Sequence, residues 1–235
     1  MHFLKNLVLN TSKNARKRRA LVFKDHFVLD EHTKILDLGS ESGSNINSLL
    51  YDSDVNPKNV YIADINEELI QHGSIKFGYQ PVLINESEPL PFPDKYFDIV
   101  FCSSVIEHVT VSKQDVWNIY SGRQFSSAAV RRQKQFAAEI DRLGKQYFVQ
   151  TPNKHFVIES HSWLPFLSYL PRRVLVPVLR LTNLIWIKKT SPDWHLLSRK
   201  EMQALFSRAK IIEEKYWGFT KSLMAVHCNR RPESV

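Results

Sequence analysis

The sequence predicts an α/β fold in which a largely parallel β-sheet carries helices on both faces. From residue 34 onward, short apolar runs alternate with polar stretches of helical spacing, such as Ile46–Leu50 and Leu69–Ile70, and this alternation is typical of repeated strand–helix–strand units. The apolar runs are nearly continuous, as expected when helices cover both faces of a sheet. The predicted strands are Lys34–Leu38, Val60–Ala63, Pro81–Ile84, Phe97–Cys102, Gln146–Gln150, Ile211–Trp217 and Leu223–Cys228.

Length and composition predict one sizeable domain. The 235 residues are 43% hydrophobic and 24% charged, which is ordinary for a globular protein that buries a full core. We expect a basic, helical N-terminal segment over residues 1–33, followed by a main domain over 34–235. A proline- and aromatic-rich insertion at about 152–192 interrupts the main domain and precedes a predicted helix over Ser198–Ala209.

Charge and cysteine content indicate possible partners and the compartment. The net charge is +8, and the first 24 residues hold seven basic side chains and no acidic one. Such a segment favours an anionic partner, namely phospholipid, nucleic acid or a phosphorylated acceptor, although a solvated helix face would look the same. Two cysteines without a CxxC pair predict neither a disulfide framework nor a metal site, and no run of about 18 apolar residues predicts a membrane span. We therefore expect a cytoplasmic protein without a bound metal.

The strongest local motif follows the first predicted strand. The segment ILDLGSESGSN places an acid, Asp37, near the end of an apolar strand, and Gly39 then opens a turn that leads to Gly43 and a polar helix start. Glycine permits a positive φ and lets a ligand approach bare backbone. The unpaired N–H groups of the following helix would favour a negatively charged ligand group.

A second acid, Asp64, ends the second predicted strand. A carboxylate at this position suits hydrogen bonding to the two ribose hydroxyls of a nucleoside. Open α/β sheets bind ligands at the carboxyl ends of their strands, so Gly39 and Asp64 should lie at the same edge. Alone, Asp64 could be a helix N-cap, but the combination favours nucleoside binding.

Several motifs in this order resemble the class I S-adenosylmethionine (SAM)-dependent methyltransferases, in particular the ubiquinone/menaquinone methyltransferase-like subgroup. The resemblance runs from about Ile35 to Pro152 and rests on the glycine turn, on LPFPDKYFDIV at residues 90–100, on Glu107-His108-Val109 and on Gln150-Thr151-Pro152-Asn153. It implies a methyltransferase enzyme that uses SAM. It also implies a Rossmann-like seven-stranded mixed sheet with helices on both faces and an antiparallel last strand.

The resemblance also implies roles for individual residues. Gly39 and Gly43 would line the methionine part of SAM, and Asp37 would order the turn and the ammonium group. The adenosyl part would meet Asp64 at the ribose and Ile65, Asn85 and Glu86 at the adenine, with Ser103 near the methionine end.

Two positions depart from the family pattern. Glu41 stands where a second glycine is usual, so its side chain must point away, pair with a cation or weaken cofactor binding. Asn85 replaces an acid, which is a mild change because an amide can both donate and accept hydrogen bonds.

Methyl transfer from a sulfonium needs positioning more than a catalytic group, but a hydroxyl acceptor would benefit from a general base. The predicted candidates are His108, which follows the fourth strand, His161 with its neighbour Glu159, and His195. A lone histidine is more often a surface or core-edge residue. We expect His108 or His161 to be the base, because one follows the fourth strand and the other lies in the insertion.

The insertion also indicates the acceptor. Residues 163–189 combine aromatic side chains, prolines and flanking cations, which suits either a lid packed over the acceptor or a peripheral contact with lipid headgroups. We expect O-methylation of a small or lipid-linked acceptor, such as a sugar, a quinone-like ring or a lipid. We also expect the protein to make a peripheral contact with an anionic surface on the inner face of a membrane.

Three other functions compete with this interpretation. A nicotinamide-dependent oxidoreductase is disfavoured because its G-x-G-x-x-G fingerprint is broken by Glu41. A binding protein with a methyltransferase fold and little or no activity, with Glu41 as the lesion, is an alternative. An RNA methyltransferase fits the basic charge less well than a small acceptor, because Asn153 and Phe156 resemble the Asn-Pro-Pro-aromatic turn only superficially.

Overall fold

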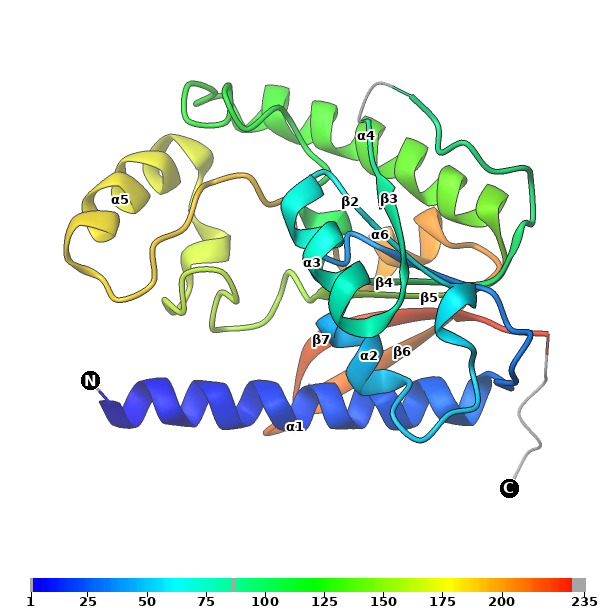
Figure 1. The fold of residues 1–235 in the computed structure, drawn as a ribbon. Helices are drawn as coiled ribbons and strands as arrows, with labels where there is room; N and C mark the ends of the chain where they lie inside the picture. Colours follow the sequence, from blue (N-terminus) through cyan, green and yellow to red (C-terminus); the bar gives the residue numbers. More distant parts are fainter. Residues whose placement is uncertain (1, 86–87, 230–235) are drawn as a thin grey trace. The chain divides into compact units, whose positions relative to one another are not determined.

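The computed structural model describes residues 2–85 and 88–229, with side chains from residue 14 onward, and contains one seven-stranded sheet of order β3-β2-β1-β4-β5-β7-β6 (Figure 1). The strands are β1 (Ile35–Leu38), β2 (Val60–Asp64), β3 (Gln80–Leu83), β4 (Phe97–Ser103), β5 (Gly144–Pro152), β6 (Lys210–Tyr216) and β7 (Phe219–His227). The α-helices are α1 (His2–His26), α2 (Ser44–Leu49), α3 (Glu67–Phe77), α4 (Gly122–Leu143), α5 (Arg172–Ile185) and α6 (Arg199–Leu205). Short 3-10 helices are η1 (Pro57–Asn59), η2 (Ile106–His108) and η3 (Leu167–Tyr169).

The predicted fold class is confirmed. The central strand β1 pairs in parallel with β2 on one side and with β4 on the other, and β2 pairs in parallel with β3. All four residues of β1 are buried, as its unbroken apolar run predicted. The last strand, β7, is antiparallel and lies between β5 and β6, which makes the sheet mixed.

The chain divides into two compact units, and strands of the sheet contribute to both. The first unit comprises Met1–Cys102, Arg142–Phe148 and Val226–Val235, and the second comprises Ser103–Asp141 and Val149–Ala225. In the first unit, Phe23 of α1 is fully buried and meets Phe101 of β4 and Phe148 of β5 edge-on. These aromatic contacts fix the C-terminal part of α1, whereas Arg16 and Lys17 are exposed.

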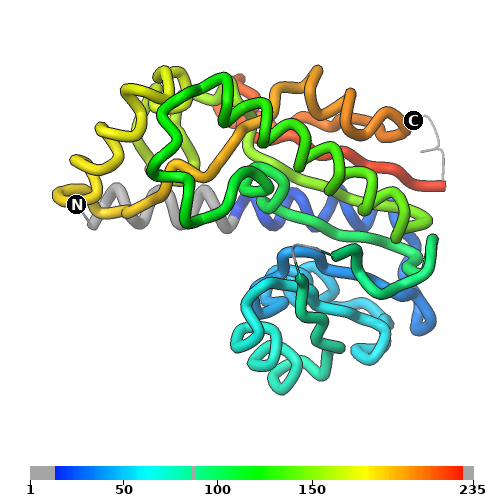
Figure 2. Tube along the Cα trace, turned by 90° about the horizontal axis from the view of Figure 1, so that it is seen from above, coloured from blue at the N-terminus to red at the C-terminus, as the bar shows by residue number. Residues whose placement is uncertain are grey.

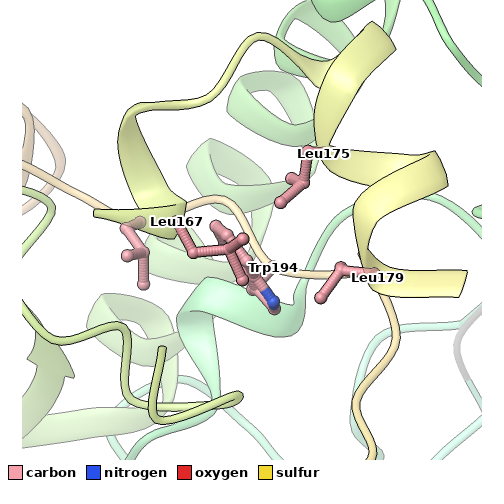
Figure 3. Close-up of a cluster of buried hydrophobic side chains, with 5 residues drawn as sticks. Leu167, Leu175, Leu179 and Trp194 are labelled. Carbon is pink, nitrogen blue, oxygen red and sulfur yellow. The ribbon is translucent and has the colours of Figure 1, made fainter. Parts of the chain in front are cut away.

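The second unit has its own apolar cluster, formed by the predicted insertion and the residues just after it. Leu167, Leu175, Leu179, Trp194 and Leu196 are all buried there, and Figure 3 shows the Trp194 indole among Leu167 and the two α5 leucines. The long helix α4, traced in green in Figure 2, was not predicted from the sequence. The middle of its buried face is formed by Ala129, Gln133 and Ala137, which are small or polar and give a weaker apolar pattern than the larger residues of the predicted elements.

The final strand begins four residues before its predicted start. Trp217 and Gly218 form the connection between β6 and β7 with φ values of 50° and 82°, a left-handed pair that permits a two-residue hairpin turn. None of the described helices is long and apolar enough to cross a membrane.

Candidate active site

The turn from β1 into α2 requires its two glycines. Gly39 has a φ of 77°, and its N–H donates to the Ala63 carbonyl at 2.8 Å, which ties the turn to β2. Gly43 has a φ of 70° and is buried, and a Cβ there would lie 2.9 Å from the Ile62 Cγ2 atom. Both the backbone angle and the close packing therefore exclude ordinary side chains at Gly43. The helix that follows, α2, has only six residues, so its dipole is small.

Glu41 adopts a left-handed backbone conformation, which a glycine would adopt without strain. Its φ is 52°, a left-handed angle that costs a non-glycine residue about 1 kcal/mol. The residue is exposed, and its N–H donates to Asp64 Oδ2 at 2.8 Å. Asn66 N–H donates to the other oxygen, Oδ1, at 3.0 Å. Glu41 thus contributes its backbone to the turn and helps to orient the carboxylate at the end of β2.

Asp37 is a buried acid beside this turn. Burial, together with the nearby charge of Asp64, raises the pKa of the Asp37 carboxyl well above its ordinary value. Its Oδ2 atom has no hydrogen-bond partner within the described part of the chain. A cationic or hydrogen-bonding ligand group would satisfy this oxygen.

The other predicted cofactor residues are distributed more widely. Ile65 and Asn85 are exposed, and Glu86 lies outside the described residues. Ser103 belongs to the second unit, where its hydroxyl donates to Gln150 Oε1 at 2.8 Å. The structure therefore brings Asp37, Gly39, Gly43 and Asp64 together at the ends of β1 and β2, and Ser103 is held by a different partner.

A cluster of acids and histidines lies in the second unit. We call Glu107, His108 and His161 the Glu–His–His cluster; one potential ligand atom from each lies within 4.8 Å of the others. Glu107 is fully buried, whereas the side chains of His161 and His108 are 15% and 36% exposed. His161 Nε2 lies 3.9 Å from Glu107 Oε1, and the two imidazoles meet edge to face at 4.7 Å between ring centroids.

Each histidine of the cluster has its own carboxylate partner. His161 Nδ1 lies 2.5 Å from Glu159 Oε1, and His108 Nδ1 lies 3.2 Å from Asp193 Oδ2. Burial alone would lower the pKa of His108, but the Asp193 hydrogen bond and the surrounding carboxylates outweigh it and raise that pKa. The same pairing works in reverse on Glu159, whose pKa is lowered by His161 despite its burial.

The loop that carries His161 is held in place by hydrogen bonds. Glu159 accepts the Ser162 N–H at 2.6 Å, so the acid also shapes the turn around His161. From the end of the insertion, Trp186 Nε1 donates to the Ser162 carbonyl, and Lys188 Nζ donates to the Ser160 carbonyl at 2.8 Å. These bonds give His161 a defined position.

His195 occupies a different place from the cluster histidines. Its Nδ1 pairs with Gln133 Oε1 at 3.1 Å, and its N–H donates to the Glu107 carbonyl at 2.7 Å. Burial and the charge of Lys154 lower the pKa of His195. His195 thus supports the backbone of the cluster and is not one of its three ligand residues.

Two residues around these histidines are not predicted as site residues from the sequence. Glu107 is named there only as part of the Glu107-His108-Val109 motif, and Asp193 is not named. The adjacent Glu-His pair was the available signal for Glu107. Nothing in the sequence distinguishes Asp193 from an ordinary loop acid, because its role depends on His108 being folded against it.

A comparison with known protein families finds a match for part of the first half of the chain. Residues 36–121 match the family model described as a methyltransferase domain, which includes the β1 turn, Asp64 and the Glu107–His108 pair. This match, together with the fold, supports a methyltransferase enzyme that uses S-adenosylmethionine as its cofactor. No curated protein sequence gives a significant match.

Solved structures share the fold at low sequence identity. The PH0226 protein from Pyrococcus horikoshii is 16% identical over 94% of this chain and 92% of its own, with a TM-score of 0.55. A chain from the Haloferax volcanii complex of the Trm112 methyltransferase activator with a methyltransferase is 13% identical over 97% and 93%, with a TM-score of 0.53. An S-adenosylmethionine-dependent methyltransferase from Clostridium acetobutylicum is 10% identical over 91% and 89%, with a TM-score of 0.52.

Proposed function

We propose that this SAM-dependent enzyme methylates a hydroxyl oxygen of a small or lipid-linked acceptor, such as a sugar, a quinone-like ring or a lipid. The observation that carries this proposal is the Glu–His–His cluster, in which carboxylates orient both imidazoles. An amine nucleophile is already reactive when neutral, whereas a hydroxyl gains reactivity when its proton is removed or its pKa is lowered. Oriented histidines beside a buried carboxylate suit a hydroxyl better than an amine.

In this proposal the first unit binds the cofactor. Asp64 binds the ribose hydroxyls, Gly39 and Gly43 allow the methionine part to approach the backbone, and Asp37 receives the ammonium group. Ile65, Asn85 and Glu86 are the proposed adenine contacts, and Ser103 is the proposed contact at the methionine end. The support is the left-handed turn, the oriented Asp64 carboxylate and the unpartnered Asp37 oxygen.

The transfer itself is an in-line displacement. A lone pair of the acceptor oxygen forms the new bond to the methyl carbon as the carbon–sulfur bond breaks, and its electron pair returns to sulfur to give S-adenosylhomocysteine. The hydroxyl proton leaves at the acceptor side, where His108 and His161, with Glu159 behind His161, are the proposed activating residues. His195 is proposed to act indirectly, by fixing the Glu107 backbone. Residues 152–192 are proposed to cover the acceptor.

Labelled cofactor tests the proposal without a known acceptor. Cell extract would be separated into small polar, lipid and RNA fractions, and each would be incubated with the enzyme and methyl-labelled SAM. We expect label in the polar or lipid fraction with the wild type and none with D64A, which should also lose SAM affinity in calorimetry. The variant H161Q should bind SAM normally but transfer little label.

Two outcomes would replace the proposal by its alternatives. Label that enters only the RNA fraction would indicate a nucleic-acid methyltransferase. Absence of SAM binding by the folded wild type would indicate a binding protein with a methyltransferase fold.

A specific surface feature favours the lipid-linked class. Leu184 and Ile185, at the end of α5, are 79% and 81% exposed, and Leu181 one turn earlier is also exposed. Arg173 and Arg180 on the same helix and Lys189 just after it are exposed too. An apolar helix end flanked by cations suits contact with an anionic lipid surface, here proposed for the inner face of a membrane.

Liposome flotation checks this extension at low salt. Wild-type protein should float with vesicles that contain anionic lipid, and L184E/I185E should stay at the bottom with unchanged SAM affinity. Absence of flotation by the wild type would restrict the acceptor to the water-soluble class, and equal flotation of the two proteins would place the lipid contact outside the end of α5.

A further inference from the structure

The Glu–His–His cluster has the spacing of a metal-binding site. Its three potential ligand atoms lie within 4.8 Å of one another, and the His161 Nε2 to Glu107 Oε1 distance is 3.9 Å. Ligands at about 2.0–2.2 Å from a divalent ion are separated by roughly 3–4.4 Å. Small side-chain rotations would therefore bring all three atoms to bonding distance of a common ion.

The histidines are oriented as metal ligands usually are. The Nδ1 atoms face Glu159 and Asp193, so Nε2 is the nitrogen that each ring can offer to a ligand. Metal-binding histidines almost always donate their second ring N–H to a carboxylate or carbonyl, which fixes the tautomer and the ring plane. Side-chain packing alone does not account for two histidines that are both oriented by carboxylates and both lie next to one buried acid.

A buried carboxylate oxygen of Glu107 points to a ligand independently of the spacing of the cluster. Its side chain is fully buried; Oε2 accepts the Thr151 hydroxyl at 2.9 Å, and Oε1 has no hydrogen-bond partner among the described residues. An unpaired carboxylate oxygen is costly in a protein interior unless a cation or a donor satisfies it. Oε1 is the oxygen that faces His161 Nε2.

The cluster is also rigidly supported. The His161 ring stacks on Trp194 at 5.7 Å with an interplanar angle of 12°, and Trp194 belongs to the apolar cluster of Figure 3. The Glu107 backbone is tied to His195, and Gln133 bonds the carbonyls of both Ile106 and His195. Such support holds ligands in position before an ion arrives.

We infer that Glu107, His108 and His161 bind one divalent first-row transition-metal ion, of the class of Mn²⁺, Fe²⁺ or Zn²⁺. Two imidazoles with one carboxylate favour these ions over Mg²⁺ and Ca²⁺, which prefer all-oxygen sites. Three protein ligands leave further coordination positions for water or a substrate oxygen. The sequence predicted no metal because the ligands come from two separate segments and follow no CxxC or HxxxH spacing.

The role of the ion rests on the proposed function, whereas its binding does not. The acceptor hydroxyl would bind the ion through oxygen, and this lowers the pKa of the hydroxyl so that its proton can pass to water. Glu159 and Asp193 are then positioning residues that act through the two histidines.

Titration of chelator-treated protein with MnCl2 or ZnCl2 tests the inference. Calorimetry should show one ion per chain for the wild type and at least tenfold weaker binding for E107Q and for H161Q. The positioning variant D193N should weaken binding by about 10–100-fold. The matched control is H155Q, since His155 is an exposed histidine outside the cluster, and it should bind the ion as the wild type does.

Pulsed electron paramagnetic resonance of the Mn²⁺ protein gives a second readout that does not depend on affinity. Nitrogen couplings from histidine should be present in the wild type and in H155Q, and reduced in H161Q. No ion binding by folded wild-type protein, or equal binding by E107Q, would overturn the inference.

Parallel SAM titrations separate this inference from the proposed function. Label transfer that persists in the absence of any ion would overturn the role of the ion in activating the acceptor and leave the methyltransferase proposal standing. Failure of the folded wild type to bind any ion, with SAM binding intact, would overturn the metal site itself. Ion binding without methyl transfer to any fraction would overturn the methyltransferase proposal and leave the metal site standing.

Discussion

At the scale of single residues, the β1 turn combines three left-handed backbone positions, of which two are glycines. Gly39 and Gly43 adopt this conformation without a side chain, and Glu41 adopts it with one. Taken from the sequence alone, Glu41 is a possible lesion. In the fold its backbone N–H donates to the Asp64 carboxylate, and the residue is exposed.

Replacement of Gly43 tests the close packing of this turn. G43A should lower the free energy of unfolding by about 2–4 kcal/mol, because a strained φ costs about 1–2 kcal/mol and the contact with Ile62 adds about 1–2 kcal/mol. The matched control is G78A, whose φ of 75° is equally strained but whose Cβ would have 3.7 Å to Pro57. Chemical denaturation should show a larger loss for G43A; equal losses would mean that the turn can relax.

We expect the Asp37 carboxyl to lower the stability of the fold at neutral pH and to strengthen cofactor binding. Because burial raises its pKa, the folded protein holds a proton there that the unfolded chain releases, so stability declines as the pH rises above the ordinary value of about 3.8 through the raised pKa. D37N removes this titration and should flatten the decline and raise stability at neutral pH. In the proposed function it should also weaken SAM binding by about 10–100-fold, since hydrogen bonds to charged groups contribute about 1.5–3 kcal/mol. Denaturation at several pH values and calorimetry with SAM measure the two effects; a steeper pH dependence in D37N would contradict the assignment.

At the scale of elements, α5 is anchored by its first residue. The buried Arg172 guanidinium donates to the carbonyls of Ile119, Pro192 and Val116 at 2.6–2.8 Å and lies 3.5 Å from the centre of the Phe125 ring. Burial lowers the pKa of Arg172 to about 10, which reflects the cost of this arrangement. One side chain thus joins three loop carbonyls to the start of α5.

A lysine at this position should not replace the arginine. R172K keeps the charge but loses the planar, multiply bonded geometry, and we expect a loss of about 2–4 kcal/mol in stability because buried carbonyls lose their donors. R173K is the control, since Arg173 is exposed and its replacement should change stability by less than about 0.5 kcal/mol. Thermal unfolding distinguishes the two; similar melting temperatures would show that Arg172 does not anchor the helix.

At the scale of the whole molecule, two separate sites should respond to two separate ligands. Hydrogen exchange should show SAM slowing exchange at residues 39–43 and 62–66, and Mn²⁺ slowing it around Glu107 and His161, because a bound ligand stabilises the segments that it contacts. The control is D64A, in which the SAM effect should vanish and the Mn²⁺ effect should remain. Protection of the Glu107 region by SAM alone, with none from the ion, would argue against a metal site.

The sequence was sufficient for the sheet and for the turn at β1. Apolar strands such as β1 are recognisable because burial on both faces demands an unbroken hydrophobic run, and Gly39 and Gly43 mark a turn by local backbone rules alone. The helix α4 was missed because Ala129, Gln133 and Ala137 in the middle of its buried face give a weak apolar pattern. The Glu–His–His cluster could be named only in part, since His108 and His161 meet through tertiary folding, and Asp193 becomes significant only when it faces His108.

The stacking of His161 on Trp194 gives the molecule an optical reporter. An indole stacked on an imidazole changes its emission when that imidazole binds a positive ion, because the altered charge shifts and quenches the excited state. Trp194 is buried in its apolar cluster, so its spectrum should be distinct from that of the strongly exposed Trp217. Events at the Glu–His–His cluster could thus be followed by light, in the unlabelled chain and in real time.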